Sequence, residues 1–157
     1  MAKLYLIGSL RNQAIPTLAA RLRKSRPEYE IFDDWFAAGP EADDYWKTYE
    51  QGKFGTDSAA YVSGLNGYAA DHVFQFDKHH LDTSSHALLV LPAGKSGHME
   101  IMYAAYGVGA NTAILLEEGV DPRWDVMYKF IPNILTSFSD VEEWLSDRGT
   151  VLGAVAA

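Results

Sequence analysis

Short apolar runs alternate along this chain with segments in which apolar residues recur every three or four positions. Such runs are typical of buried strands, and the spaced segments are typical of helices that pack one face on a core. The predicted strands are Lys3–Gly8, Tyr29–Phe32, His86–Leu91, Thr112–Glu117 and Ile131–Leu135. The predicted helices are Ile15–Lys24, Glu41–Tyr49, Asp57–Leu81, Met99–Val108 and Asp140–Ser146.

Glycine, proline and polar capping residues mark the expected boundaries of these elements. Asp33–Pro40 is predicted to be a loop because it combines paired aspartates with a Gly-Pro step. The long predicted helix is expected to be interrupted near Gly64 and Gly67. Ser139 is the expected N-cap of the last helix.

Strands that alternate with helices predict an α/β protein whose mostly parallel sheet is covered on both faces. We therefore expect a flavodoxin-like (Rossmann-like) three-layer sandwich with about five parallel strands. The 157 residues contain no internal repeat or linker, so we expect one domain spanning 1–157. The small, apolar tail Thr150–Ala157 is expected to be frayed or packed against a neighbouring subunit.

Composition excludes several classes of function. The formal net charge of −8 argues against a nucleic-acid polymer as partner, because broad binding of that kind needs a basic surface. With no cysteine, the chain has no disulfide, thiolate nucleophile or cysteine-based zinc site. Apolar runs are too short for a signal peptide or a membrane span, so we expect a cytoplasmic protein without a membrane partner.

Two carboxylates are the strongest candidates for chemistry. Glu100 follows the predicted central strand and a small-residue loop, and it is expected in the first turn of a helix, where the helix dipole favours a charged carboxylate. Asp77 precedes the same strand, and the rise per residue of helix and strand places it in the upper half of the sheet, near Glu100. Two carboxylates beside one cleft can cleave a glycosidic bond, one as nucleophile and the other as proton donor or orienting group.

Two glycine-containing loops could bind an anion. The GKS at Gly94–Ser96 is not a phosphate loop of nucleoside triphosphatases, because Leu89 stands where that motif needs glycine. The loop is either a tight turn or a cradle of backbone N–H groups that, with the Ser96 hydroxyl, holds a phosphate or sugar hydroxyl. Gly8–Asn12 is similar, and Arg11 there is either a phosphate ligand or a solvated charge.

The remaining side chains leave their roles open. Aromatic and acidic residues alternate in Asp33–Trp46, which suits either stacking on a base or simple packing on the core. The five histidines lack a zinc-binding pattern, so we expect no metal and no cofactor. No GxSxG elbow occurs, which argues against a serine hydrolase.

Four segments, in this order, resemble the nucleoside 2-deoxyribosyltransferase superfamily, which includes the 2′-deoxynucleoside 5′-phosphate N-hydrolases. They are LYLIGSLRN at 4–12, DDWFAAGP at 33–40, FQFDKHHL at 74–81 and SGHMEIMYAA at 96–105. The chain departs from the family pattern at His98, where many members have glycine, and at Met102. The GSLRN loop is more similar to the hydrolases than to the transferases.

The resemblance implies a role for each matching residue. Glu100 would be the nucleophile at the anomeric carbon, Asp77 would assist at the base, and Tyr5 would orient the nucleophile. The implied substrate-binding residues are Gly8, Ser9, Arg11, Asp34, Trp35, Phe36, Ser96, Gly97 and His98. The resemblance also implies a homodimer or higher homo-oligomer in which a neighbour helps close the site.

The sequence therefore predicts cleavage or transfer of the N-glycosidic bond of 2′-deoxynucleosides or their 5′-monophosphates. Glu100 would form a covalent deoxyribosyl ester, which water or a second base resolves. Two alternatives stay open at this point. A catalytic glutamate on such a sheet could cleave NAD, as in TIR-type NADases, or the chain could bind nucleotides without turnover.

Overall fold

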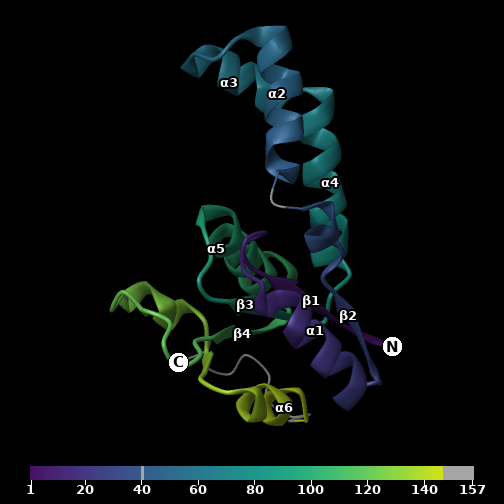
Figure 1. Ribbon diagram of the computed structural model, residues 1–157, viewed down its shortest axis with the longest axis vertical. Coiled ribbons are helices and arrows are strands. Elements are labelled where there is room, and N and C mark those ends of the chain that lie inside the picture. Colours follow the sequence, from purple (N-terminus) through teal and green to yellow (C-terminus); the bar gives the residue numbers. More distant parts are fainter. Residues whose placement is uncertain (40, 147–157) are drawn as a thin grey trace.

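Five parallel strands form a single sheet in the order β2-β1-β3-β4-β5 (Figure 1). The computed structural model describes residues 1–39 and 41–146, and the predicted tail Thr150–Ala157 lies outside them. The strands are β1 Ala2–Ile7, β2 Tyr29–Phe32, β3 His86–Val90, β4 Asn111–Leu115 and β5 Asn133–Leu135. Helices cover both faces, which confirms the predicted flavodoxin-like three-layer fold.

Residues of β1 alternate between two hydrophobic cores, as side chains of a strand must. Leu4 and Leu6 pack in the core beneath the helices α1 (Ala14–Ser25) and α6 (Phe138–Ser146). Tyr5 and Ile7 point to the opposite face and pack in a second core. Because both faces are covered, the central strands are apolar at nearly every position, which is why they read as continuous runs.

The second core lies beneath α5 (Lys95–Met102), the following π-helical turn η2 (Tyr103–Val108) and the end of α4 (Tyr68–Asp82). Two short 3₁₀ helices, η1 (Asp34–Ala38) and η3 (Val126–Phe130), lie in the connections that follow β2 and β4. The predicted loop Asp33–Pro40 therefore contains a helical turn among its described residues.

Three helices form an arm that projects from the sheet (Figure 1). They are α2 (Ala42–Phe54), α3 (Ser58–Leu65) and α4, whose last turns lead back to β3. The predicted interruption of the long helix is confirmed, since α3 ends at Leu65 and α4 begins at Tyr68. Gly67, the N-cap of α4, has an extended backbone conformation. The Asp57 carboxylate accepts the Ala60 N–H at 2.8 Å and caps α3.

Two predicted helix starts are wrong. The helix predicted from Met99 begins at Lys95. The last helix begins at Phe138, so Ser139 lies inside it, and the Ser137 hydroxyl instead accepts the Asp140 N–H at 3.1 Å. Asp140 in turn accepts hydrogen bonds from Thr136, which keeps the pKa of its carboxyl low and resembles a capping box.

Among the described residues, no helix has both the length and the apolar character that crossing a membrane requires.

Candidate active site

The candidate site lies at the carboxyl ends of β1 and β3. After β1 the chain continues to β2, which pairs with one edge of β1. The next strand, β3, pairs with the other edge of β1. This reversal of strand order opens a crevice where open α/β sheets bind ligands. The strands β1 and β3 therefore bring the loop after Ile7 beside the loop after Val90.

Tyr5, Glu100 and Asp77 meet at this edge, although they come from β1, α5 and α4. The buried Tyr5 hydroxyl is hydrogen-bonded to both carboxylates. Burial raises the Tyr5 pKa far above its usual range, and the charges of Glu100 and Asp77 raise it further. The hydroxyl therefore stays protonated and has one hydrogen to offer to two carboxylates.

The position of Glu100 within its helix corrects one prediction. Because α5 begins at Lys95, Glu100 lies in the second turn, and the first turn carries no acidic residue. The helix dipole acts mainly within the first turn, so the predicted dipole stabilisation of Glu100 does not apply. The Glu100 carboxylate is instead hydrogen-bonded to the Tyr5 hydroxyl.

Gly97 lies where α5 packs closely on the sheet. A Cβ at Gly97 would lie 3.2 Å from both Ile7 Cγ2 and Leu89 Cδ1, so a larger residue would require these side chains to shift. Glycine here allows close packing of helix and strand, and it is buried. Gly97 therefore supports the site through packing, and direct contact with substrate stays a prediction.

The phosphate candidates lie on the loop after β1 and at the start of α5. The Ser9 hydroxyl accepts the Arg11 N–H at 3.1 Å and shapes the first loop. Arg11 is exposed, and no ion pair to its guanidinium occurs within residues 1–39 and 41–146. Exposed Ser96 lies in the first turn of α5, beside Lys95, a cation that the sequence reading missed. Gly8 approaches the Val90 carbonyl, so a Cβ there would come within 3.3 Å of it.

His98 links α5 to η3 in the connection between β4 and β5. Its Nδ1 donates to the Gly94 carbonyl at 2.7 Å, and its Nε2 accepts from the Tyr128 hydroxyl at 3.0 Å. The two rings are stacked with centroids 5.6 Å apart. Burial raises the Tyr128 pKa, and Asp125 adds to the effect, so this hydroxyl remains a donor. Both ring nitrogens of His98 are thus engaged within the protein.

Tyr128 is a site neighbour that sequence reasoning missed. It lies on η3, thirty positions after His98, and no short motif surrounds it. Only the three-dimensional contact shows that η3 is attached to the helix that carries Glu100.

The predicted base-binding residues on η1 are divided between core and surface. The Trp35 indole N–H donates to the Leu6 carbonyl at 2.8 Å, and Trp35 and Phe36 pack on the core. Asp34 is exposed. The aromatic pair is therefore anchored to β1, and its contact with a base stays a prediction.

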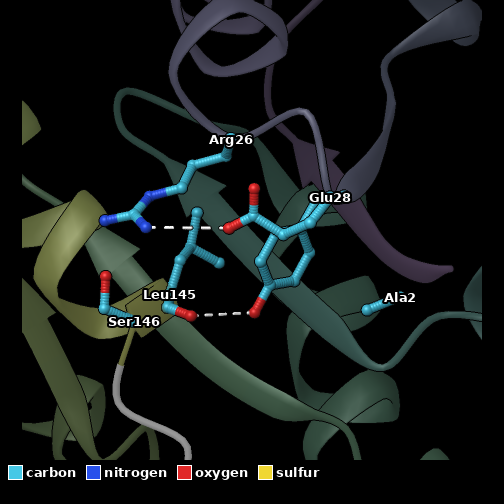
Figure 2. Close-up of a pocket in the computed structure, with 6 residues that line it drawn as sticks. Ala2, Arg26, Glu28, Leu145 and Ser146 are labelled. Carbon is cyan, nitrogen blue, oxygen red and sulfur yellow. Dashed lines mark hydrogen bonds and ion pairs between the residues drawn. The ribbon is translucent and has the colours of Figure 1, made fainter.

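A hollow of about 310 Å³ lies at the other edge of the sheet (Figure 2). Its lining residues are Ala2, Arg26, Glu28, Tyr29, Leu145 and Ser146. In Figure 2 the side chains of Arg26 and Glu28 point toward one another, and their charged atoms lie 3.6 Å apart. Because these residues flank the amino ends of β1 and β2, the hollow is separate from the Glu100 site.

The described residues contain no cluster of three histidine or acidic side chains suited to a metal.

The fold is shared with solved structures of low sequence identity. The crystal structure of a conserved protein from Enterococcus faecalis V583 superposes with a TM-score of 0.62 at 15% identity, covering 94% of this chain and 99% of that one. The structure of the Clostridium botulinum CMP N-glycosidase BcmB superposes with a TM-score of 0.51 at 11% identity, covering 92% of this chain and 97% of that one. The sequence matches no protein-family model and no curated protein.

Proposed function

We propose that the protein cleaves or transfers the N-glycosidic bond of 2′-deoxynucleosides or their 5′-monophosphates. The observation that carries this proposal is the contact of the Tyr5 hydroxyl with both Glu100 and Asp77 at the crevice of the sheet. A CMP N-glycosidase with the same fold supports the class of bond. The resemblance of the four sequence segments supports the deoxyribosyl substrate.

In the proposed first step, a Glu100 oxygen attacks the anomeric carbon of the sugar. A carbon–oxygen bond forms, the bond to the base nitrogen breaks, and the base leaves with that electron pair. Asp77, in its protonated form, donates its proton to the departing base and becomes a carboxylate. Tyr5 donates its hydrogen bond to one oxygen of Glu100, which orients the other oxygen for attack.

In the second step, water attacks the same carbon and releases Glu100 as a carboxylate. The proton lost by water passes to Asp77, which restores the acid for the next turnover. A second base in place of water would give transfer. For monophosphate substrates, Ser9 and Arg11 after β1 and Ser96 at the start of α5 would offer a 5′-phosphate hydroxyl groups, a guanidinium and backbone N–H groups.

The test compares Glu100→Gln with wild type on deoxynucleosides, their 5′-monophosphates, CMP and NAD, with base release read by chromatography. Loss of the nucleophile should lower kcat roughly 10³-fold or more. Glu118→Gln is the matched control, since Glu118 is exposed beyond β4 at the same edge of the sheet. Intact-protein mass spectrometry of wild type during turnover should show one deoxyribosyl adduct, mapped to Glu100.

Three outcomes would contradict the proposal. Wild-type activity in Glu100→Gln would remove Glu100 as nucleophile. Release of nicotinamide from NAD, without base release from any deoxynucleoside, would indicate an NAD-cleaving enzyme. A rise in melting temperature with nucleotides and no product from any substrate would indicate a binding protein.

A further inference from the structure

The helices that carry the two site carboxylates are joined a second time, away from Tyr5. The Tyr103 hydroxyl, at the start of η2, donates to Asp82 Oδ1, at the end of α4, at 2.5 Å. Asp82 Oδ2 accepts from Lys78 Nζ at 2.7 Å, and that ammonium lies 5.6 Å from the centre of the Tyr103 ring. These three side chains, Lys78, Asp82 and Tyr103, are called the α4–η2 tie.

Tyr103 is placed to control the position of Glu100. The helix continues from α5 into η2 without a break, since Met102 and Tyr103 both have helical backbone angles. Residues three apart on a helix lie on the same face, about one turn apart, so Tyr103 follows Glu100 on the face that meets α4. A movement of the turn at Tyr103 would therefore also move Glu100.

The other end of the tie lies on the helix that carries Asp77. In Figure 1, α4 runs from the projecting arm to the sheet, so the contacts of its last turns decide where Asp77 lies relative to Glu100. Lys78 and Asp82 are in those turns. Their hydrogen bonds, with that from Tyr103, lower the pKa of the Asp82 carboxyl, which therefore stays a charged acceptor at neutral pH.

The π-helical turn η2 is shaped around the Tyr103 ring. A Cβ on Gly107 would lie 2.7 Å from both Tyr103 Cδ1 and Cε1, so a larger residue there would require the ring to shift. Turns of the π type are rare and occur frequently at functional sites. The close approach of Gly107 holds the ring in the place from which its hydroxyl meets Asp82.

We infer that Tyr103 is a positioning residue, which through Asp82 fixes the helix of Glu100 against the helix of Asp77. The Tyr5 hydroxyl can bond to both carboxylates only while these helices keep their separation. The effect on catalysis rests on the proposed function, whereas the effect on the two carboxylates does not.

The first test needs no substrate. In protein labelled with ¹³C at its aspartate and glutamate carboxyls, NMR titration follows Asp77 and Glu100, assigned with Asp77→Asn and Glu100→Gln. Two carboxyls on one hydroxyl, that of Tyr5, titrate as a coupled pair, so their apparent pKa values should lie more than about one unit apart in wild type. Tyr103→Phe, which keeps the ring and removes the hydroxyl, should bring the two values closer together because the carboxyls then interact less.

Tyr106→Phe is the matched control in the same turn. It also removes one hydrogen bond of a tyrosine hydroxyl, but that bond goes to the Phe130 carbonyl on η3, at 2.6 Å, and not to α4. The titration of the pair should stay as in wild type. Asp82→Asn, which keeps an oxygen acceptor for Tyr103, should change the titration less than Asp82→Ala does.

The second test measures kcat and KM on the deoxynucleoside or 5′-monophosphate that wild type cleaves fastest. A displacement of about 1 Å can lower a rate about 100-fold, so Tyr103→Phe should lower kcat roughly tenfold. KM should stay within about twofold, because the contacts that bind substrate are kept. Tyr103→Phe combined with Asp82→Ala should cost no more than the larger single effect, since both remove the same contact.

The outcomes separate this inference from the proposed reaction. An unchanged carboxyl titration in Tyr103→Phe would overturn the inference, whatever the activity. A changed titration in a protein that releases no base from any substrate would support the tie and contradict the reaction. An equal fall of kcat in Tyr103→Phe and Tyr106→Phe would show a general loosening of η2 and would also overturn the inference.

Discussion

At the scale of single residues, the least expected feature is a buried lysine behind Tyr5. Lys3 lies two positions before Tyr5 on β1, and its Nζ donates to His80 Nδ1 at 2.6 Å and Thr83 Oγ1 at 3.0 Å. A lysine ammonium has no lone pair, so His80 must accept and therefore carries its hydrogen on Nε2. His80 also stacks on Phe32, with centroids 3.9 Å apart. This contact ties α4, and with it Asp77, to β1.

The burial of His80 beside Lys3 should make stability depend on pH. Burial lowers the His80 pKa, Lys3 and His79 lower it further, and Asp34 and Glu30 oppose them. Below about pH 6.5 the unfolded chain therefore binds a proton that the folded chain resists, so stability should rise with pH up to that value. In His80→Gln, which keeps an acceptor for Lys3, the rise in the free energy of unfolding between about pH 5 and pH 8 should be smaller.

Urea unfolding of both proteins at the two pH values measures this difference. His86 also has a pKa lowered by burial, but it is present in both proteins and cancels in the comparison. An equal rise in wild type and variant would show that the titration of His80 is not coupled to folding.

At the scale of elements, strands were easier to predict than helix starts. Buried parallel strands are continuous apolar runs, so β1 to β4 were found within two residues of their ends. The start of α5 was missed because GKSG has two glycines and looks like a turn. An added Cβ at Gly97 would lie only 3.2 Å from Ile7 and Leu89, so glycine fits the close packing of α5 on the sheet, and the sequence alone does not distinguish that requirement from a turn.

The arm offers a direct test of a glycine needed for space. A Cβ on Gly67 would overlap the carboxylate of buried Glu50, which accepts the Ala69 N–H at 3.4 Å at the start of α4. Gly67→Ala should therefore displace that carboxylate and lower the free energy of unfolding by about 1–3 kcal/mol. Thermal and urea unfolding, read by circular dichroism, measure the loss.

Gly52 provides the matched control on the same arm. It lies inside α2 with nothing within 4 Å of an added Cβ. Gly52→Ala should raise stability by up to about 1 kcal/mol, because alanine favours helix. Equal effects of the two substitutions would mean that the Glu50 contact does not restrict position 67.

At the scale of the whole molecule, the parallel topology assembles the candidate site. Carboxyl ends of β1 and β3 are neighbours, so Tyr5 and the loops before α1 and α5 converge whatever the lengths of the connections between them. That convergence could be anticipated from the order of strands and helices. Contacts such as His98 with Tyr128 could not, because they depend on the path of a long connection rather than on periodicity.

The same topology predicts where a bound nucleotide should slow hydrogen exchange. With a deoxynucleoside 5′-monophosphate bound to Glu100→Gln, backbone N–H groups in residues 8–13, in α5 and in η3 should exchange more slowly, because the ligand stabilises the loops that hold it. The helices α1 and α6 lie beneath the other face and should exchange as before. Hydrogen–deuterium exchange with mass spectrometry resolves these segments. Slower exchange at residues 26–29 and 142–146, with none in α5, would instead place the nucleotide in the hollow at the amino edge of the sheet.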